Sequence, residues 1–143
     1  MFYNPWHDAR DNFPEYVINM RHELPRGLAG GVVGRTIYLC RTLTQEARRC
    51  VLCHELVHLR RGTRHVHGNV KAREEFEVDR IAARLLITPD QFVDAMMWSR
   101  SRAHNECAAE LGVDGHTFRV WVQTLNKSER DYIEARLKQR EEP

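Results

Sequence analysis

The segment His54-Glu55-Leu56-Val57-His58 constrains this chain more than any other, because it matches the pattern H-E-x-x-H. On an α-helix, residues four positions apart lie about 40° apart around the axis, so His54 and His58 can direct their imidazole nitrogens at one metal ion. A catalytic Zn²⁺ site takes three protein ligands and leaves one position to water. Glu55 lies beside the two histidines and is predicted to be the general base that takes a proton from that water.

The same pattern also arises by chance on ordinary charged helices, so its surroundings matter. Here the neighbours Val51, Leu52 and Leu56 are apolar, as in a buried helix. Burying two histidines and a glutamate costs several kcal/mol unless each finds a partner, and a metal ion supplies partners for all three. The segment therefore favours a zinc site over a coincidence.

The whole chain has the size and composition of one globular domain, with 143 residues of which 42% are hydrophobic and 29% are charged. A net charge of +2 is too small to indicate a nucleic-acid or membrane partner. The N-terminus lacks an apolar run after a basic start, and no window approaches the about 18 apolar residues of a membrane span. We therefore expect a cytoplasmic protein without a membrane partner.

The four cysteines, at positions 40, 50, 53 and 107, are too few for a disulfide scaffold, and we expect them to be reduced. Cys50 and Cys53 form a C-x-x-C pair that can also belong to a structural zinc site. At about 100° per residue, however, Cys53 points away from His54. Both cysteines are therefore predicted to be small buried hydrophobic residues.

Two β-strands are predicted near the N-terminus, at residues 16–20 and 36–40, and an antiparallel pairing is expected between them. Residues 24–31 are interpreted as a turn-rich connection. A capping box at Thr42 predicts a helix from there to about residue 60, which ends at Gly62. Arg60 and Arg61 are interpreted as surface charges at its carbonyl end.

Two further helices are predicted after this one. Residues 72–86 show an apolar stripe of helical period. A second capping box, at Thr88 with Pro89 and Gln91, predicts a new helix. Its large apolar side chains are expected in the core: Phe92, Val93, Met96, Met97 and Trp98.

The third metal ligand is open between four residues: His65, Glu74, Glu75 and Glu77. His65 lies eleven residues after His54, one more than the H-E-x-x-H-x-x-G-x-x-H pattern requires. Glu77 lies at the edge of the apolar stripe and is predicted to face solvent.

The residue one helical turn later distinguishes the two remaining glutamates, Glu74 and Glu75, as candidates for the third ligand. Glu75 is followed there by Asp79, which can accept a hydrogen bond from the outer nitrogen of a ligating histidine. Glu74 has only Val78 at that place. The sequence therefore favours Glu75 as the third ligand, with Asp79 hydrogen-bonded to the outer nitrogen of a ligating histidine.

From about residue 30 to 90, the chain resembles the ImmA/IrrE metallopeptidases. The resemblance rests on residues 35–39, 49–58 and 75–87, of which the last block is similar to E-x-E-A-(N/D)-x-F-A-x-x-L-L-M-P. Val78 and Ile81 replace the usual alanine and phenylalanine, and Thr88 is inserted before Pro89. The resemblance implies a cytoplasmic zinc peptidase that cuts a particular regulator, often a helix-turn-helix repressor encoded in a phage or mobile element. Glu75 and Asp79 occupy its first acidic and its N/D positions.

Residues 99–143 are expected to form a C-terminal helical subdomain beside a zincin-like peptidase core at residues 1–98. Residues 105–122 have the outline of a helix-turn-helix. Its second helix offers only Arg119 and Gln123 for reading bases, and the basic residues that follow are interleaved with acidic ones. We expect this subdomain to pack on the core, where it could dock a repressor, rather than to bind an operator.

The predicted fold is α+β, mainly helical with a small N-terminal antiparallel sheet, and the predicted function is a zinc endopeptidase. Two other classes stay open: a DNA-binding regulator with a structural or vestigial metal, and a module that binds a repressor without cutting it. Candidates for stabilising the developing oxyanion are Tyr38, His65 and His67.

Overall fold

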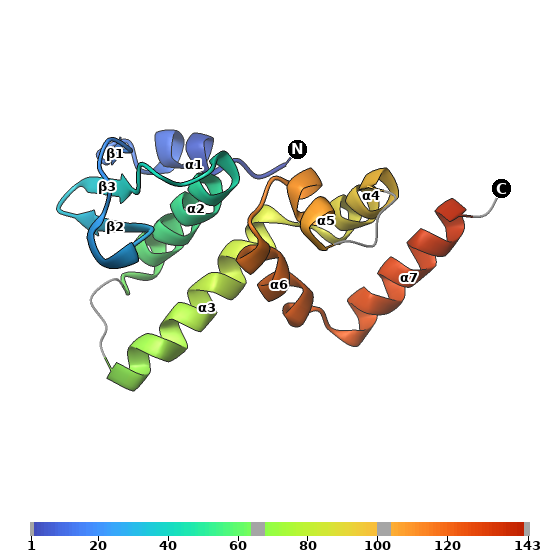
Figure 1. The fold of residues 1–143 in the computed structure, drawn as a ribbon. Coiled ribbons are helices and arrows are strands. Elements are labelled where there is room, and N and C mark those ends of the chain that lie inside the picture. Colours follow the sequence, from blue (N-terminus) through green and yellow to red (C-terminus); the bar gives the residue numbers. More distant parts are fainter. Residues whose placement is uncertain (1, 64–67, 100–103, 142–143) are drawn as a thin grey trace.

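The computed structural model describes residues 2–63, 68–99 and 104–141. It confirms a mainly helical α+β fold with a small N-terminal sheet (Figure 1). In chain order the elements are α1 (Pro5–Asn12), β1 (Val17–Asn19), a 3-10 turn η1 (Pro25–Gly27), β2 (Gly30–Val33), β3 (Thr36–Leu39), α2 (Gln45–Arg61), α3 (Gly68–Leu86), α4 (Pro89–Ser99), α5 (His104–Leu111), α6 (Gly115–Thr124) and α7 (Lys127–Glu141).

The sheet is mixed, which corrects the predicted antiparallel pairing. Its strand order is β1-β3-β2, and the two predicted strands, now β1 and β3, run parallel. The antiparallel partner of β3 is β2, which lies in the segment interpreted as a connection. Gly30 and Gly31 concealed this strand, because glycine has little β propensity. Gly34, with φ +57°, makes the tight turn between β2 and β3.

The sheet packs on α2 through the side chains that alternate on one face of β3. Ile37 and Leu39 are fully buried and form an apolar cluster with Leu52 and Leu56 of α2. Because successive strand residues point to opposite faces, Tyr38 points away from α2. This packing fixes the helix that carries the H-E-x-x-H segment directly beneath the sheet.

The start of α2 differs from the prediction by two residues. Thr44, not Thr42, is the N-cap, and its hydroxyl accepts a hydrogen bond from the backbone N–H of Ala47 at 3.1 Å. The hydroxyl of Thr42 instead contacts the Sγ atom of Cys40. The predicted end is confirmed, because Gly62 caps the helix in the left-handed conformation with φ +66°.

The basic end of α2 forms specific ion pairs, so Arg60 and Arg61 are more than the general surface charges that we expected. Arg60 reaches the buried Asp8 of α1, which also accepts hydrogen bonds from Tyr3 at 2.5 Å and Asn12 at 2.8 Å. Arg61 pairs with Glu74 of α3. These pairs tie α2 to its neighbours on both sides.

A second apolar cluster joins α2 and α3 to the C-terminal helices and crosses the boundary predicted at residue 98. Trp121 of α6 is fully buried, and its indole N–H donates to the carbonyl of Ile87 at 2.9 Å. Arg49 of α2 donates to the carbonyl of Gly112, between α5 and α6, at 3.0 Å. In Figure 1, α6 accordingly lies against α3 in the middle of the molecule.

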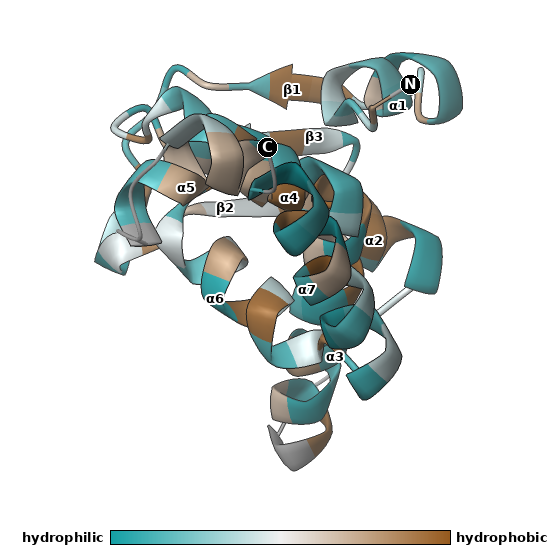
Figure 2. Cartoon of the chain, turned by 90° about the vertical axis from the view of Figure 1, so that its right-hand side faces the viewer, coloured by the Kyte–Doolittle hydropathy of each residue, from teal (hydrophilic) through white to brown (hydrophobic). Residues whose placement is uncertain are grey.

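The capping box before α4 is confirmed in both directions: the backbone N–H of Thr88 donates to the side chain of Gln91, and that of Gln91 donates to the hydroxyl of Thr88. Val93 is buried as predicted, but Trp98 is 77% exposed and does not belong to the core. The reason is helical register, since Trp98 lies on a different face of α4 from Val93. Figure 2 shows that α7, which packs on α4, is mostly hydrophilic.

All four cysteines are unpaired and buried, as predicted for Cys50 and Cys53. Within the described ranges, the structure has no helix with the length and hydropathy required to cross a membrane.

Candidate metal centre

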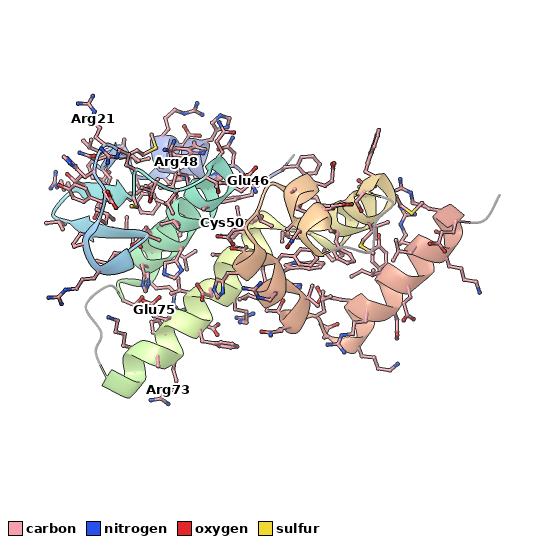
Figure 3. The ribbon with its side chains drawn as sticks, in the orientation of Figure 1. Arg21, Glu46, Arg48, Cys50, Arg73 and Glu75 are labelled. Atoms are coloured by element: carbon pink, nitrogen blue, oxygen red, sulfur yellow. The ribbon has the colours of Figure 1, made fainter. Side chains whose placement is uncertain are left out.

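The candidate metal centre lies where α2 packs against α3. His54 and His58 lie one turn apart on α2, and their rings are 4.8 Å apart between centroids. Glu75 of α3 lies opposite, with one carboxylate oxygen 3.0 Å from Nε2 of His54 and the other 2.9 Å from Nε2 of His58. Figure 3 shows Glu75 directed toward α2, whereas Arg73 of the same helix points away. Among the described residues, the structure thus brings together two imidazoles and a carboxylate.

The geometry and chemistry of this cluster fit a small cation. The three ligand atoms lie within 4.8 Å of one another. Zinc ligands at about 2.0–2.1 Å in a tetrahedron are about 3.3 Å apart, close to the separations of 2.9 and 3.0 Å. Two nitrogens and one oxygen are a donor set that suits Zn²⁺.

The outer nitrogens of both histidines have partners that leave Nε2 free to face the cluster. Nδ1 of His54 donates to Oδ1 of Asp79 at 2.8 Å, because a carboxylate can only accept. Nδ1 of His58 lies 3.1 Å from the hydroxyl of Thr63. Such contacts fix the tautomer and orientation of a ligating imidazole. Asp79 thus contacts the outer nitrogen of His54, and its role in orienting a metal ligand remains a prediction.

The other candidates for the third ligand lie elsewhere or outside the described residues. Glu74 forms an ion pair with Arg61, and Glu77 forms one with Arg80. His65 and His67 lie outside the described residues. Of the three candidate glutamates, Glu75 is the one that contacts both histidines, and its role as a ligand remains a prediction.

Glu55 is buried beside the cluster and lines a pocket of about 210 Å³ together with His54 and Asp79. Burial raises the pKa of Glu55; His54 opposes this change, and the carboxylate of Glu75 adds to it. A raised pKa brings a carboxylate closer to the range in which it accepts and returns protons near neutral pH. This position and environment suit the predicted general base.

The two histidines differ in how their surroundings shift their pKa values. For His54, burial acts to lower the pKa, but the hydrogen bond to Asp79 and the nearby carboxylates outweigh it, so the pKa is raised. For His58, burial and the neighbouring His54 hold the pKa below its usual value. The carboxylates thus dominate at His54, whereas burial dominates at His58.

His116 was not predicted from the sequence as a residue of the pocket. His116, at the start of α6, lies with its Nε2 atom 3.1 Å from Oδ2 of Asp79. It is 37 positions from Asp79, so no helical or strand period connects the two. Tyr38, a predicted oxyanion candidate, points away from α2 and packs near His22 instead.

A buried glutamate beside a His-His-Glu cluster on two packed helices is an arrangement that suits a metal ion and the hydrolysis of peptide bonds. Comparison with known families gives the same class: the sequence profile of the IrrE N-terminal-like domain (Peptidase M78) matches residues 9–120. The chain belongs to this family; it is a metallopeptidase, a hydrolase that acts on protein substrates. No curated protein and no solved structure matches the chain.

Proposed function

We propose that this protein is a zinc-dependent endopeptidase in which His54, His58 and Glu75 hold the ion and Glu55 is the general base. The observation that carries the proposal is the convergence of the two imidazoles and one carboxylate beside a buried fourth group. Two nitrogen ligands favour Zn²⁺ over Mg²⁺ and Ca²⁺, which prefer oxygen. One zinc ion per chain is therefore expected.

When bound, the zinc ion would supply Lewis acidity, which lowers the pKa of a bound water toward about 7 and polarises a carbonyl. Glu55 accepts the proton of the attacking water on its carboxylate and then gives it to the departing amine. Asp79 and Thr63 hold the imidazole rings of His54 and His58 in a fixed orientation meanwhile. The burial of Glu55 limits the access of other water to its carboxylate.

The pocket supports an extended protein segment as the substrate. Its wall includes Ala29 and Gly30, at the beginning of β2. Since β2 is an edge strand of the sheet, its outer side can pair with an added strand. An extended segment bound there would pass close to Glu55, which suits cleavage within a chain.

The proposed substrate is a regulatory protein, specifically a helix-turn-helix repressor, and the proposed setting is the host cytoplasm of a phage or mobile element. This part of the proposal rests on the resemblance of residues 75–87 to the ImmA/IrrE metallopeptidases. The subdomain of residues 99–143 is proposed to dock the substrate rather than to bind DNA.

Mass spectrometry of a helix-turn-helix repressor encoded near the gene of this protein, after incubation with the protein, tests the proposal. The zinc-loaded wild type should produce defined fragments, and Glu55→Gln should keep its zinc and fold but produce none, because an amide cannot accept the proton. Glu46→Gln, in the first turn of the same helix, is the matched control and should cleave normally. Cleavage by zinc-loaded Glu55→Gln would rule out the general-base role. A repressor that binds the wild type uncut would indicate an interaction module instead.

A further inference from the structure

The first turn of α6 forms one wall of the pocket that contains Glu55. This wall includes Asp114, His116 and Thr117. Asp79 connects this wall with the candidate metal centre, because one of its carboxylate oxygens contacts His54 and the other contacts His116. Oδ1 accepts from His54 at 2.8 Å, and Oδ2 lies 3.1 Å from His116. A helix from the C-terminal part of the chain is thus one hydrogen bond away from the residue that orients His54.

The position of His116 is fixed by the packing of α6. Asp114 caps this helix by accepting from the backbone N–H of Thr117 at 2.8 Å, which places His116 in its first turn. Thr117 and Trp121 are buried on the face of α6 that packs inward, and the indole N–H of Trp121 donates to the carbonyl of Ile87, directly after α3. Arg49 of α2 donates a hydrogen bond to the carbonyl of Gly112 in the turn before α6. Both helices of the candidate metal centre therefore position His116.

We propose that His116 is a positioning residue for the metal centre and acts through Asp79. Its Nε2–H donates to Oδ2 and restricts rotation of the Asp79 carboxylate. Oδ1 then stays in line with Nδ1 of His54, and Nε2 of His54 stays directed at the cluster. The inference rests on the proposed function, because it requires His54 to be a metal ligand.

Two simpler roles of His116 are weaker explanations of this contact. As a surface ion pair it would contribute little, since exposed pairs are worth about 0–1 kcal/mol. However, Asp79 is only partly exposed, and its other oxygen holds the outer nitrogen of His54. A direct contact with the substrate would not require the hydrogen bond to Asp79. The role through Asp79 accounts for both carboxylate oxygens, because Oδ2 accepts from His116 while Oδ1 orients His54.

Zinc affinity, measured by competition with a chelator, tests the inference without relying on peptidase activity. Loss of a residue behind a metal ligand typically weakens metal binding about 10- to 100-fold, and His116 lies one bond further away. We expect His116→Leu to weaken zinc binding about 3- to 10-fold, as the loss of one hydrogen bond does. His116→Gln, which restores an N–H donor of similar reach, should recover most of the affinity. His7→Leu, at an exposed position on α1, should leave it unchanged.

A double-variant comparison separates an action through Asp79 from a general structural effect. In the Asp79→Ala background, His116→Leu should cause no further loss of zinc affinity, because the bond that it removes is already absent. An equal loss in both backgrounds would overturn the inference. So would unchanged zinc affinity in His116→Leu, even if its peptidase activity fell, since this would indicate a direct contact with the substrate.

His54→Ala shows whether the underlying proposal fails instead. If zinc affinity is the same in His54→Ala and the wild type, the proposed metal centre is wrong, and the inference falls with it. If His54→Ala loses zinc while His116→Leu binds it as the wild type does, only the role of His116 is wrong.

Discussion

Replacing Gly30 with alanine should destabilise the protein, because a side chain there has no room. A Cβ atom on Gly30 would lie 2.5 Å from Cγ1 of Val51 and 2.9 Å from the carbonyl oxygen of Tyr38. The methyl group of Val51 can rotate away, but the carbonyl belongs to the backbone of the central strand. Either β2 must move from β3, or the sheet must move from α2.

The expected loss follows from two opposing contributions. Overpacking costs about 1–3 kcal/mol, and the backbone contact places Gly30→Ala in the upper half of that range. Alanine also has less conformational freedom than glycine in the unfolded chain, and this difference stabilises the folded state by about 0.4–1 kcal/mol. The net loss is about 1–2.6 kcal/mol, which corresponds to a fall of about 3–9 °C in the Tm of a domain of this size.

The matched control is Gly31→Ala, because a Cβ atom at Gly31 has no neighbour within 4 Å. Urea unfolding of the metal-free proteins measures both effects, with equal m values as the sign of a common unfolding transition. Gly31→Ala should be as stable as the wild type or slightly more stable. If Gly30→Ala were equally stable, β2 would not pack beside β3 and against α2 as described.

Three further predictions concern stability. The Arg60 guanidinium, with Tyr3 and Asn12, lowers the pKa of Asp8 from 3.8 to about 2, so its contribution is present above about pH 4 and is lost as the pH falls toward 2. Asp8→Asn should lower the free energy of unfolding by about 2 kcal/mol at neutral pH. In urea unfolding at a series of pH values, the variant should lose less stability below about pH 4 than the wild type does, and an equal loss would contradict the ion pair. In thermal unfolding, Thr44→Ala should lower the free energy of unfolding by about 1 kcal/mol and Thr42→Ala by less. The reverse order would show that Thr42 is the N-cap of α2. Chelation of zinc should lower the Tm, since a ligand at about 1,000 times its Kd stabilises by about 4 kcal/mol, and an unchanged Tm would indicate weak or no binding.

Much of the candidate site could be predicted from the sequence because its geometry is local to two helices. The spacing of His54 and His58 places both on one face of α2 in any α-helix. The same periodicity on α3 distinguished Glu75, with Asp79 one turn later, from Glu74 and from Glu77. No detail of tertiary structure was required for these assignments.

The errors and omissions concern interactions that depend on distant parts of the chain. His116 meets Asp79 only because α6 packs on α3, which depends on buried contacts such as that of Trp121. The parallel pairing of β1 and β3 depends on the missed strand β2, which adjoins β3 on the other side. Trp98 is large and apolar, and composition alone did not show that its side of α4 is mostly exposed.

The zinc affinity of glutamate variants is the most direct test of the proposed metal centre. The comparison uses Glu75→Ala and the variants of its three rivals, Glu74→Ala, Glu77→Ala and His65→Ala, in chelator competition. Glu75→Ala should lose more than about 100-fold, because even residues behind the ligands contribute about 10- to 100-fold. The other three should bind zinc nearly as well as the wild type. If Glu75→Ala kept its affinity, or if another of these variants lost more, the assignment of His54, His58 and Glu75 as the ligand set would be contradicted.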